Sequence, residues 1–125
     1  MGLNNLLMAA NIKRYKSDIN DNLRSGLLFA YKRKLINKIY NDDDYESTNI
    51  DQIFLPYNNE GTADLDPYND NDMVIAHSVR HLGEKQSEEV AKEFIEELKS
   101  LGWKITDTYH EDGCIVVIVD WGDKD

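Results

Sequence analysis

Apolar residues recur at every fourth position between residues 18 and 40, and this pattern constrains the fold more than any other feature of the sequence. The repeat consists of Ile19, Leu23, Leu27, Tyr31, Leu35 and Ile39. Residues four apart lie on one face of a helix, so the pattern predicts an amphipathic helix with a long apolar stripe. Ser17 is typical of a helix N-cap, so we expect this helix to begin there and a shorter helix to cover residues 3–15.

A second regular region follows at the C-terminal end of the sequence. Residues 73–80 are predicted to form a strand, in which His77 would share a face with Met73, Ile75 and Val79, and the spacing over 87–101 predicts a helix. Two further strands are expected at 103–109 and 114–121, because Asp112-Gly113 between them is typical of a tight antiparallel hairpin. The sequence therefore predicts an α+β fold: two N-terminal helices, an acidic irregular segment, and a C-terminal β-α-β-β unit with an antiparallel hairpin.

The middle of the chain shows little regular pattern. Residues 41–72 hold both prolines and many Asn and Asp residues, and an apolar cluster at 50–55 is expected to form a short strand or to anchor a long loop. We divide the chain into a basic helical segment at 1–40, an acidic Asn/Asp-rich loop region at 41–72 and a β-α-β-β unit at 73–125. These parts are expected to form one compact domain.

The predicted strand 114–121 is apolar on both of its faces. A strand of this kind is normally covered on both sides. Helix 87–101 is expected to supply one cover, and either helix 18–40 or another molecule is expected to supply the other.

Charge is divided between the two ends of the chain. Residues 1–40 carry eight basic and two acidic side chains, a net charge of +6, while residues 41–125 carry six basic and twenty-two acidic side chains, a net charge of −16. A polarity of this strength points to charged partner surfaces. The candidate basic partner-binding face is Arg24, Lys32, Arg33, Lys34 and Lys38, and the candidate acidic partner-binding face is Asp64, Asp66, Asp70 and Asp72.

Two groups of residues are candidate metal ligands. His77 and His81 have the i,i+4 spacing that lets two histidines on a helix bind one ion, but on the predicted strand they would lie roughly 13 Å apart. The acidic stretch 64–72 supplies oxygen ligands but lacks the glycine and the bidentate glutamate of an EF-hand loop. We therefore expect neither a metal site nor a cofactor.

Catalysis finds little support in the sequence. No phosphate-binding loop, dinucleotide-binding glycine pattern or nucleophile elbow is present. Cys114 and His110 flank the predicted turn, but a cysteine on the inner face of a strand is usually a small hydrophobic residue. Asp120 is the acid that a metal-dependent enzyme would be expected to use. The other interpretation of Asp120 is an acid at the end of a strand that reaches solvent. We predict no catalytic residue.

The interpretation that fits these features best is a non-enzymatic interaction protein, either an assembly subunit or an inhibitor or regulator of a larger partner. We expect a protein partner, with self-association as one form of it, and charge mimicry of nucleic acid as one mode of action. The Asn-, Ile-, Lys- and Tyr-rich composition suggests a phage or another mobile element. The alternatives are a nucleic-acid-binding accessory protein that uses helix 18–40 and a divalent-metal-dependent enzyme.

The location of the protein is predicted from the absence of targeting features. No apolar run reaches the ~18–20 residues of a membrane span, and residues 1–16 do not have the order of a signal peptide. With its single cysteine, the chain is expected to be cytoplasmic, in the host cell if it is viral, and to bind no membrane.

Overall fold

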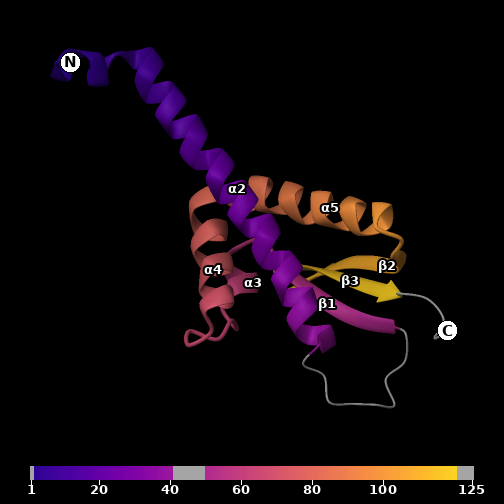
Figure 1. Cartoon of the computed structure of the whole chain (residues 1–125). Coiled ribbons are helices and arrows are strands. Elements are labelled where there is room, and N and C mark those ends of the chain that lie inside the picture. The colour runs from indigo at the N-terminus through magenta and orange to yellow at the C-terminus, as the bar shows by residue number, and fades with distance from the viewer. Residues whose placement is uncertain (1, 41–49, 121–125) are drawn as a thin grey trace.

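The computed structural model describes residues 2–40 and 50–120, apart from the Leu6 side chain, and it confirms the predicted α+β class (Figure 1). Its helices are Leu3–Leu7 (α1), Ala9–Tyr40 (α2), Asn59–Thr62 (α3), Asp70–Leu82 (α4) and Glu84–Ser100 (α5). Its strands are Ile50–Pro56 (β1), Lys104–Glu111 (β2) and Cys114–Asp120 (β3). Residue 121, the predicted end of the last strand, lies outside the described residues.

One long helix occupies most of the N-terminal region, and Ser17 lies inside it instead of capping it. The predicted boundary was wrong because residues 9–25 contain neither Pro nor Gly, so nothing there interrupts the backbone hydrogen bonds of a helix. The break between the two N-terminal helices falls at Met8, whose backbone is extended (φ −60°, ψ 130°).

The sheet contains three antiparallel strands in the order β1-β3-β2. The predicted hairpin between β2 and β3 is confirmed, and its turn has positive φ at both Asp112 (49°) and Gly113 (79°), as a tight hairpin requires. The third strand is β1, which confirms the short strand that was one of the two structures expected for the apolar cluster at 50–55. Ile53 and Leu55 are buried there while Phe54 between them is 38 % exposed, the alternation typical of a strand.

The predicted strand 73–80 was wrong, because these residues belong to α4. The spacing of Ile75 and Val79 fits both the two-residue repeat of a strand and the 3.6-residue repeat of a helix. The buried residues of α4, however, are Ile75, Ser78, Val79 and Leu82, and this set follows helical spacing. The Asn69 side chain caps the helix by accepting a hydrogen bond from the backbone N–H of Asp72 (3.0 Å). The predicted β-α-β-β unit is therefore replaced, among the described residues, by α4, α5, β2 and β3 in that order.

A single core joins three helices to one face of the sheet. It contains Leu27, Ala30, Tyr31 and Leu35 from α2, Ile75, Val79 and Leu82 from α4, Val90, Ala91, Phe94, Ile95 and Leu98 from α5, and Ile53, Leu55, Ile115, Val117 and Val119 from the sheet. The rings of Tyr31 and Phe94 lie 6.1 Å apart at its centre. Both helices that we expected to cover opposite faces of β3 thus share one core.

The other face of β3 is covered by its neighbouring strands. Val116 is fully buried there, and its cross-strand partners are Phe54 of β1 and Tyr109 of β2, each 38 % exposed. Large side chains on adjacent strands shield a small central one in this arrangement.

α2 also bonds to the edge strand β1 at two points. The Tyr31 hydroxyl donates a hydrogen bond to the carbonyl of Pro56, and the Lys38 ammonium donates one to the carbonyl of Gln52. Edge strands carry unpaired backbone groups that attract other chains, and two of these groups on β1 are satisfied by α2. The helix therefore packs on the core and satisfies two backbone groups of the β1 edge.

We predict that Tyr31→Phe lowers the free energy of unfolding by about 1–3 kcal/mol, because the buried Pro56 carbonyl loses its hydrogen-bond donor. Urea denaturation followed by circular dichroism measures the change. Tyr15→Phe, at an exposed position of α2, is the matched control and should leave the stability unchanged. Equal stability of the two variants would contradict the assigned role of the Tyr31 hydroxyl.

Candidate interaction site

Three of the five residues of the predicted basic face form ion pairs within the chain. Arg24 pairs with Glu89 (3.1 Å), Lys32 with Glu97 (2.6 Å) and Lys38 with Asp51 (3.2 Å). All six side chains are partly exposed, so each pair contributes little to stability. The pairs nevertheless bind α2 to α5 and β1 and neutralise much of the charge that a partner could use.

The other two basic residues have different surroundings. The Arg33 guanidinium lies 5.9 Å from the centre of the Phe29 ring, a cation–π contact on the exposed side of α2. Lys34 lines a pocket of about 360 Å³ together with Asp64 and Cys114. Burial lowers the pKa of Lys34, and the negative charge of Asp72 opposes that shift. The structure thus brings Lys34 of the predicted basic face close to the acidic stretch.

The predicted acidic face divides between this pocket and the start of α4. Asp70 and Asp72 lie in the first turn of α4, where negative charge is favoured. Asp66 accepts a hydrogen bond from the backbone N–H of Tyr68 (2.9 Å), and Asp72 accepts one from the N–H of Asp66 (3.1 Å). These carboxylates stabilise the loop and the helix start. Within residues 2–40 and 50–120, no group of three or more His, Cys, Asp or Glu could hold a metal ion.

Cys114 and His110, which flank the hairpin turn, have different partners. The Cys114 thiol is buried against the Gly61 carbonyl (3.8 Å), and burial raises the pKa of this thiol, which opposes thiolate formation. The His110 ring instead contacts the Tyr57 hydroxyl (Nδ1 to O, 3.0 Å). Asp120 lies at the end of β3, opposite Lys104 and Ile50 in the sheet register.

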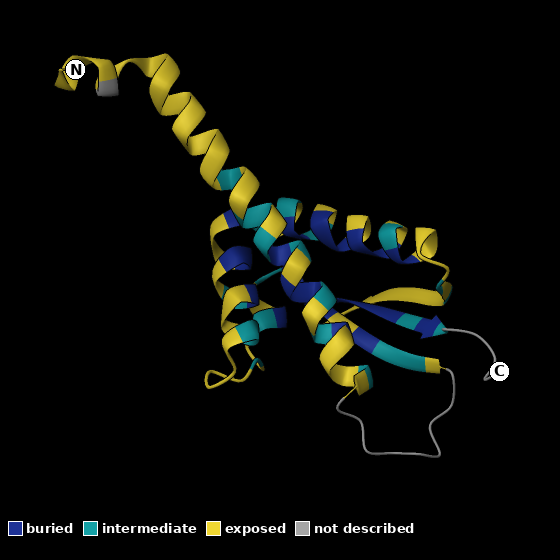
Figure 2. Cartoon of the chain, in the orientation of Figure 1, coloured by how far each residue is buried: buried dark blue, intermediate teal, exposed yellow. Residues whose placement is uncertain are grey.

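The N-terminal part of the chain projects from the rest of the molecule (Figure 2). Each residue of α2 before Asn20 is exposed, and the Asn20 amide donates a hydrogen bond to Gln86 (2.8 Å) where the helix meets the other elements. We call residues 2–19 the projecting arm and the remaining described residues the body. The free part of α2, residues 9–19, is about 16 Å long.

The projecting arm carries an apolar stripe and an uncompensated positive charge. Ile12, Tyr15 and Ile19 follow the three- and four-residue spacing of a helix face and are 39 %, 67 % and 41 % exposed. Lys13, Arg14 and Lys16 lie between them, and they form no ion pair with any residue that the structure describes. A contiguous exposed apolar surface of this kind is typical of an interaction site.

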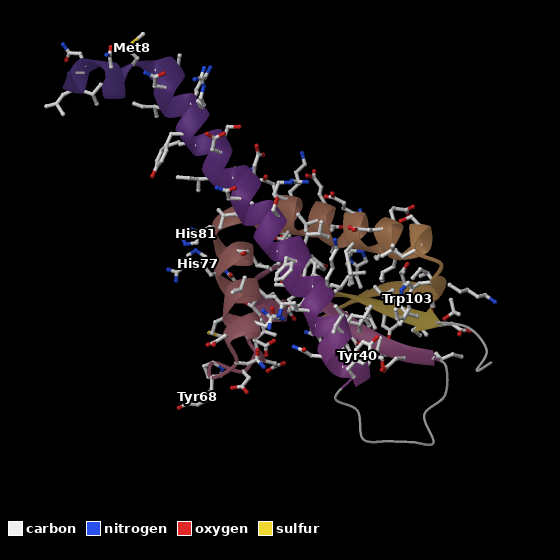
Figure 3. The ribbon with its side chains drawn as sticks, viewed as in Figure 1. Met8, Tyr40, Tyr68, His77, His81 and Trp103 are labelled. Carbon is white, nitrogen blue, oxygen red and sulfur yellow. The ribbon has the colours of Figure 1, made fainter. Side chains whose placement is uncertain are left out.

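The body has an apolar groove at its other end. It lies between α2 and α5, encloses about 450 Å³ and is lined mainly by Leu35, Ile36, Ile39, Phe94, Leu98, Leu101 and Trp103, with Lys32, Tyr40 and Glu97 also contributing. In Figure 3, Met8 lies beside the free end of α2, whereas Tyr40 and Trp103 lie at the opposite end of the molecule.

Neither the projecting arm nor the groove was identified as a site from the sequence. The spacing of Ile12, Tyr15 and Ile19 was a usable signal, but the predicted helix start at Ser17 divided these residues between two helices. The groove carried no local signal, because residues from α2 and α5 meet there through tertiary packing.

Comparison with known protein families, with curated proteins and with solved structures finds no match for this chain. No helix among the described residues is long and apolar enough to cross a membrane.

The burial of Lys34 predicts that the stability of the protein depends on pH. Its ordinary pKa is 10.5 and burial lowers it, so the folded state holds the charged ammonium less readily than the unfolded chain does. The contribution of Lys34 to the free energy of unfolding therefore rises with pH between the lowered pKa and 10.5. Lys34→Met should be more stable than the wild type at pH 7, and the difference should narrow as the pH is raised toward 10.

Chemical denaturation across this pH range measures the difference between the two proteins. The raised pKa of the buried Tyr31 affects wild type and variant alike, so it cancels in the comparison. Lys13→Met, on the projecting arm, is the control and should give no pH-dependent difference. If the difference in free energy of unfolding between Lys34→Met and the wild type stays constant with pH, this would contradict the lowered pKa of Lys34.

Proposed function

We propose that this protein is a non-enzymatic interaction protein, a subunit of an assembly in which the projecting arm of one copy docks in the apolar groove of the next. The observation that carries the proposal is the arm itself, an exposed helix with an apolar stripe that extends away from the body. An inhibitor or regulator would use the same arm on a larger partner.

The apolar surfaces of the arm and the groove complement each other. Ile12, Tyr15 and Ile19 present one apolar helix face, and an amphipathic helix typically binds in a groove with residues at this spacing. In the groove, Ile36 is 51 % exposed and Leu101 is 68 % exposed. Burial of these side chains against one another would supply the favourable free energy of docking.

The arm of a given copy cannot fill the groove of the same copy. Both belong to one unbroken helix, with Ile19 in the arm and Leu35 in the groove. Sixteen residues of helix separate these two positions by about 24 Å. A second copy offers the same stripe without that restriction, and it therefore fits the groove where the first cannot.

The charges of the two surfaces are also complementary. The arm carries three basic side chains and one acidic one, Asp18, while α5 beside the groove carries six Glu and three Lys. Four of these six Glu form ion pairs within the chain, so the charge complementarity is partial. Complementary charge of this kind steers association and selects orientation more than it adds affinity. Contact between two different surfaces is heterologous and extends head to tail from copy to copy.

We predict concentration-dependent association that weakens as salt is raised to about 0.5 M, because screening then shortens to a few ångströms. The arm variant Ile12→Asn with Tyr15→Asn and the groove variant Ile36→Asn with Leu101→Asn should each weaken association by at least about tenfold. Size-exclusion chromatography with light scattering and sedimentation velocity measure the molar mass.

Matched controls separate the interface from effects on helix stability. Ala10→Asn with Ser17→Asn places two Asn residues on the opposite side of the same helix, and Phe29→Asn removes an exposed apolar residue of α2 outside the groove. Both controls should associate as the wild type does.

A mixture of the arm variant and the groove variant gives the sharpest test. The arm variant keeps an intact groove and the groove variant keeps an intact arm, so together they should form a 1:1 dimer that does not grow further. A symmetric arm-to-arm contact would give no such rescue. A monomeric wild type at all concentrations would overturn self-assembly and leave the larger partner as the occupant of the arm.

A further inference from the structure

Two of the three histidines of the chain lie side by side on α4. His77 and His81 are both exposed, and the centres of their rings are 4.4 Å apart (Figure 3). They are separated by one helical turn, a rise of about 6 Å. The strand expected from the sequence would have placed them more than twice as far apart.

The packing of α4 fixes the side of the helix on which the two rings lie. Ile75, Val79 and Leu82 are buried in the core on the opposite side. The Asn69 cap and the turn at Gly83, whose φ is 84°, define where the helix begins and ends. The two imidazoles are therefore held in neighbouring positions by a folded backbone, while their exposed rings remain free to rotate about their side-chain bonds.

We infer that His77 and His81 together bind one divalent transition-metal ion of the zinc, nickel or copper group. Imidazole nitrogens are good ligands for these ions, and the i,i+4 spacing on a helix brings two of them to a single ion. This inference does not depend on the proposed assembly, because neither histidine belongs to the arm or the groove.

The site is open, with protein ligands at two of its positions. No third His, Cys, Asp or Glu joins this pair into a ligand cluster in the described part of the chain. Water molecules fill the remaining coordination positions, so affinity is lower than at a structural site with four protein ligands. The ion remains accessible to a further ligand from solvent.

The local field also favours a cation. His81 lies in the last turn of α4, and the carbonyl end of a helix carries partial negative charge that attracts positive ions. The chain as a whole has a net charge of −10, which acts in the same direction. Arg80 is the nearest basic neighbour along the helix and opposes this attraction.

Isothermal titration of the full chain with Ni²⁺ or Zn²⁺, in a buffer that does not chelate metals, tests the site. We expect one ion per chain, and at least about tenfold weaker binding for His77→Ala and for His81→Ala, since each leaves a single imidazole. Both residues are exposed, so these variants should fold as the wild type does, which circular dichroism checks.

Two controls distinguish chelation by the pair from binding to histidines in general. His110→Ala removes the remaining histidine, whose ring contacts Tyr57 on another part of the molecule, and should bind as the wild type does. The double variant His81→Lys with Lys85→His keeps the number of histidines and the net charge but separates the pair, so it should bind as weakly as His81→Ala.

Paramagnetic Ni²⁺ supplies a second measurement, because it should broaden the NMR signals of α4 around residues 77–81 first. Undiminished binding by His77→Ala or by the double variant would overturn the proposal. Absence of saturable binding would overturn it as well. A stoichiometry of one ion per two chains would replace the water-completed site with one shared between two copies.

Discussion

Burial of one side of α2 is the interaction on which the rest of this structure depends. Leu27, Tyr31 and Leu35 are buried in the core that α2 shares with α4, α5 and the inner face of the sheet, and full burial of each large apolar side chain is worth about 1.5–3 kcal/mol. A three-stranded sheet gains independent stability from a packed hydrophobic face. Without α2, the sheet would lose both a cover for that face and the groups that satisfy the edge of β1.

The divided charge of the sequence has a structural use within one molecule. Three basic residues of α2, Arg24, Lys32 and Lys38, pair with acids of α5 and β1, so opposite charges from the two parts of the sequence become neighbours after folding. Lys13, Arg14 and Lys16 on the arm form no ion pair with a described residue, and neither do Arg33 and Lys34 on the body. The unpaired basic residues of α2 are thus divided between the arm and the body.

The sequence predicted that residues 18–40 are helical, but neither where the helix begins nor which residues of its stripe are buried. Ile19 is 41 % exposed although Leu27 and Tyr31 are buried, because every residue of α2 before Asn20 lies beyond the point where the helix meets the other elements. A strand was predicted over residues 73–80 because the spacing of Ile75 and Val79 fits the repeat of a strand as well as that of a helix. Tertiary packing decided in favour of the helix.

The candidate sites were harder to predict for the same reason. The hairpin follows from a local rule at Asp112-Gly113, and it was predicted correctly. Whether a basic residue such as Lys32 is paired depends on Glu97, sixty-five positions away, and no local pattern encodes that contact. The wrong secondary structure around His77 also concealed the proximity of the two imidazoles.

Because α2 runs without a break from the body into the arm, the number of residues between them sets the direction of the apolar stripe and the length of the arm. Each residue inserted between Asn20 and Leu27 would turn the stripe by about 100° around the helix axis relative to the body, whereas seven would restore its direction and lengthen the arm by about 10 Å. If copies are joined through this arm, the rotation of the stripe about the axis of α2, relative to the body, sets the pitch and handedness of the resulting array.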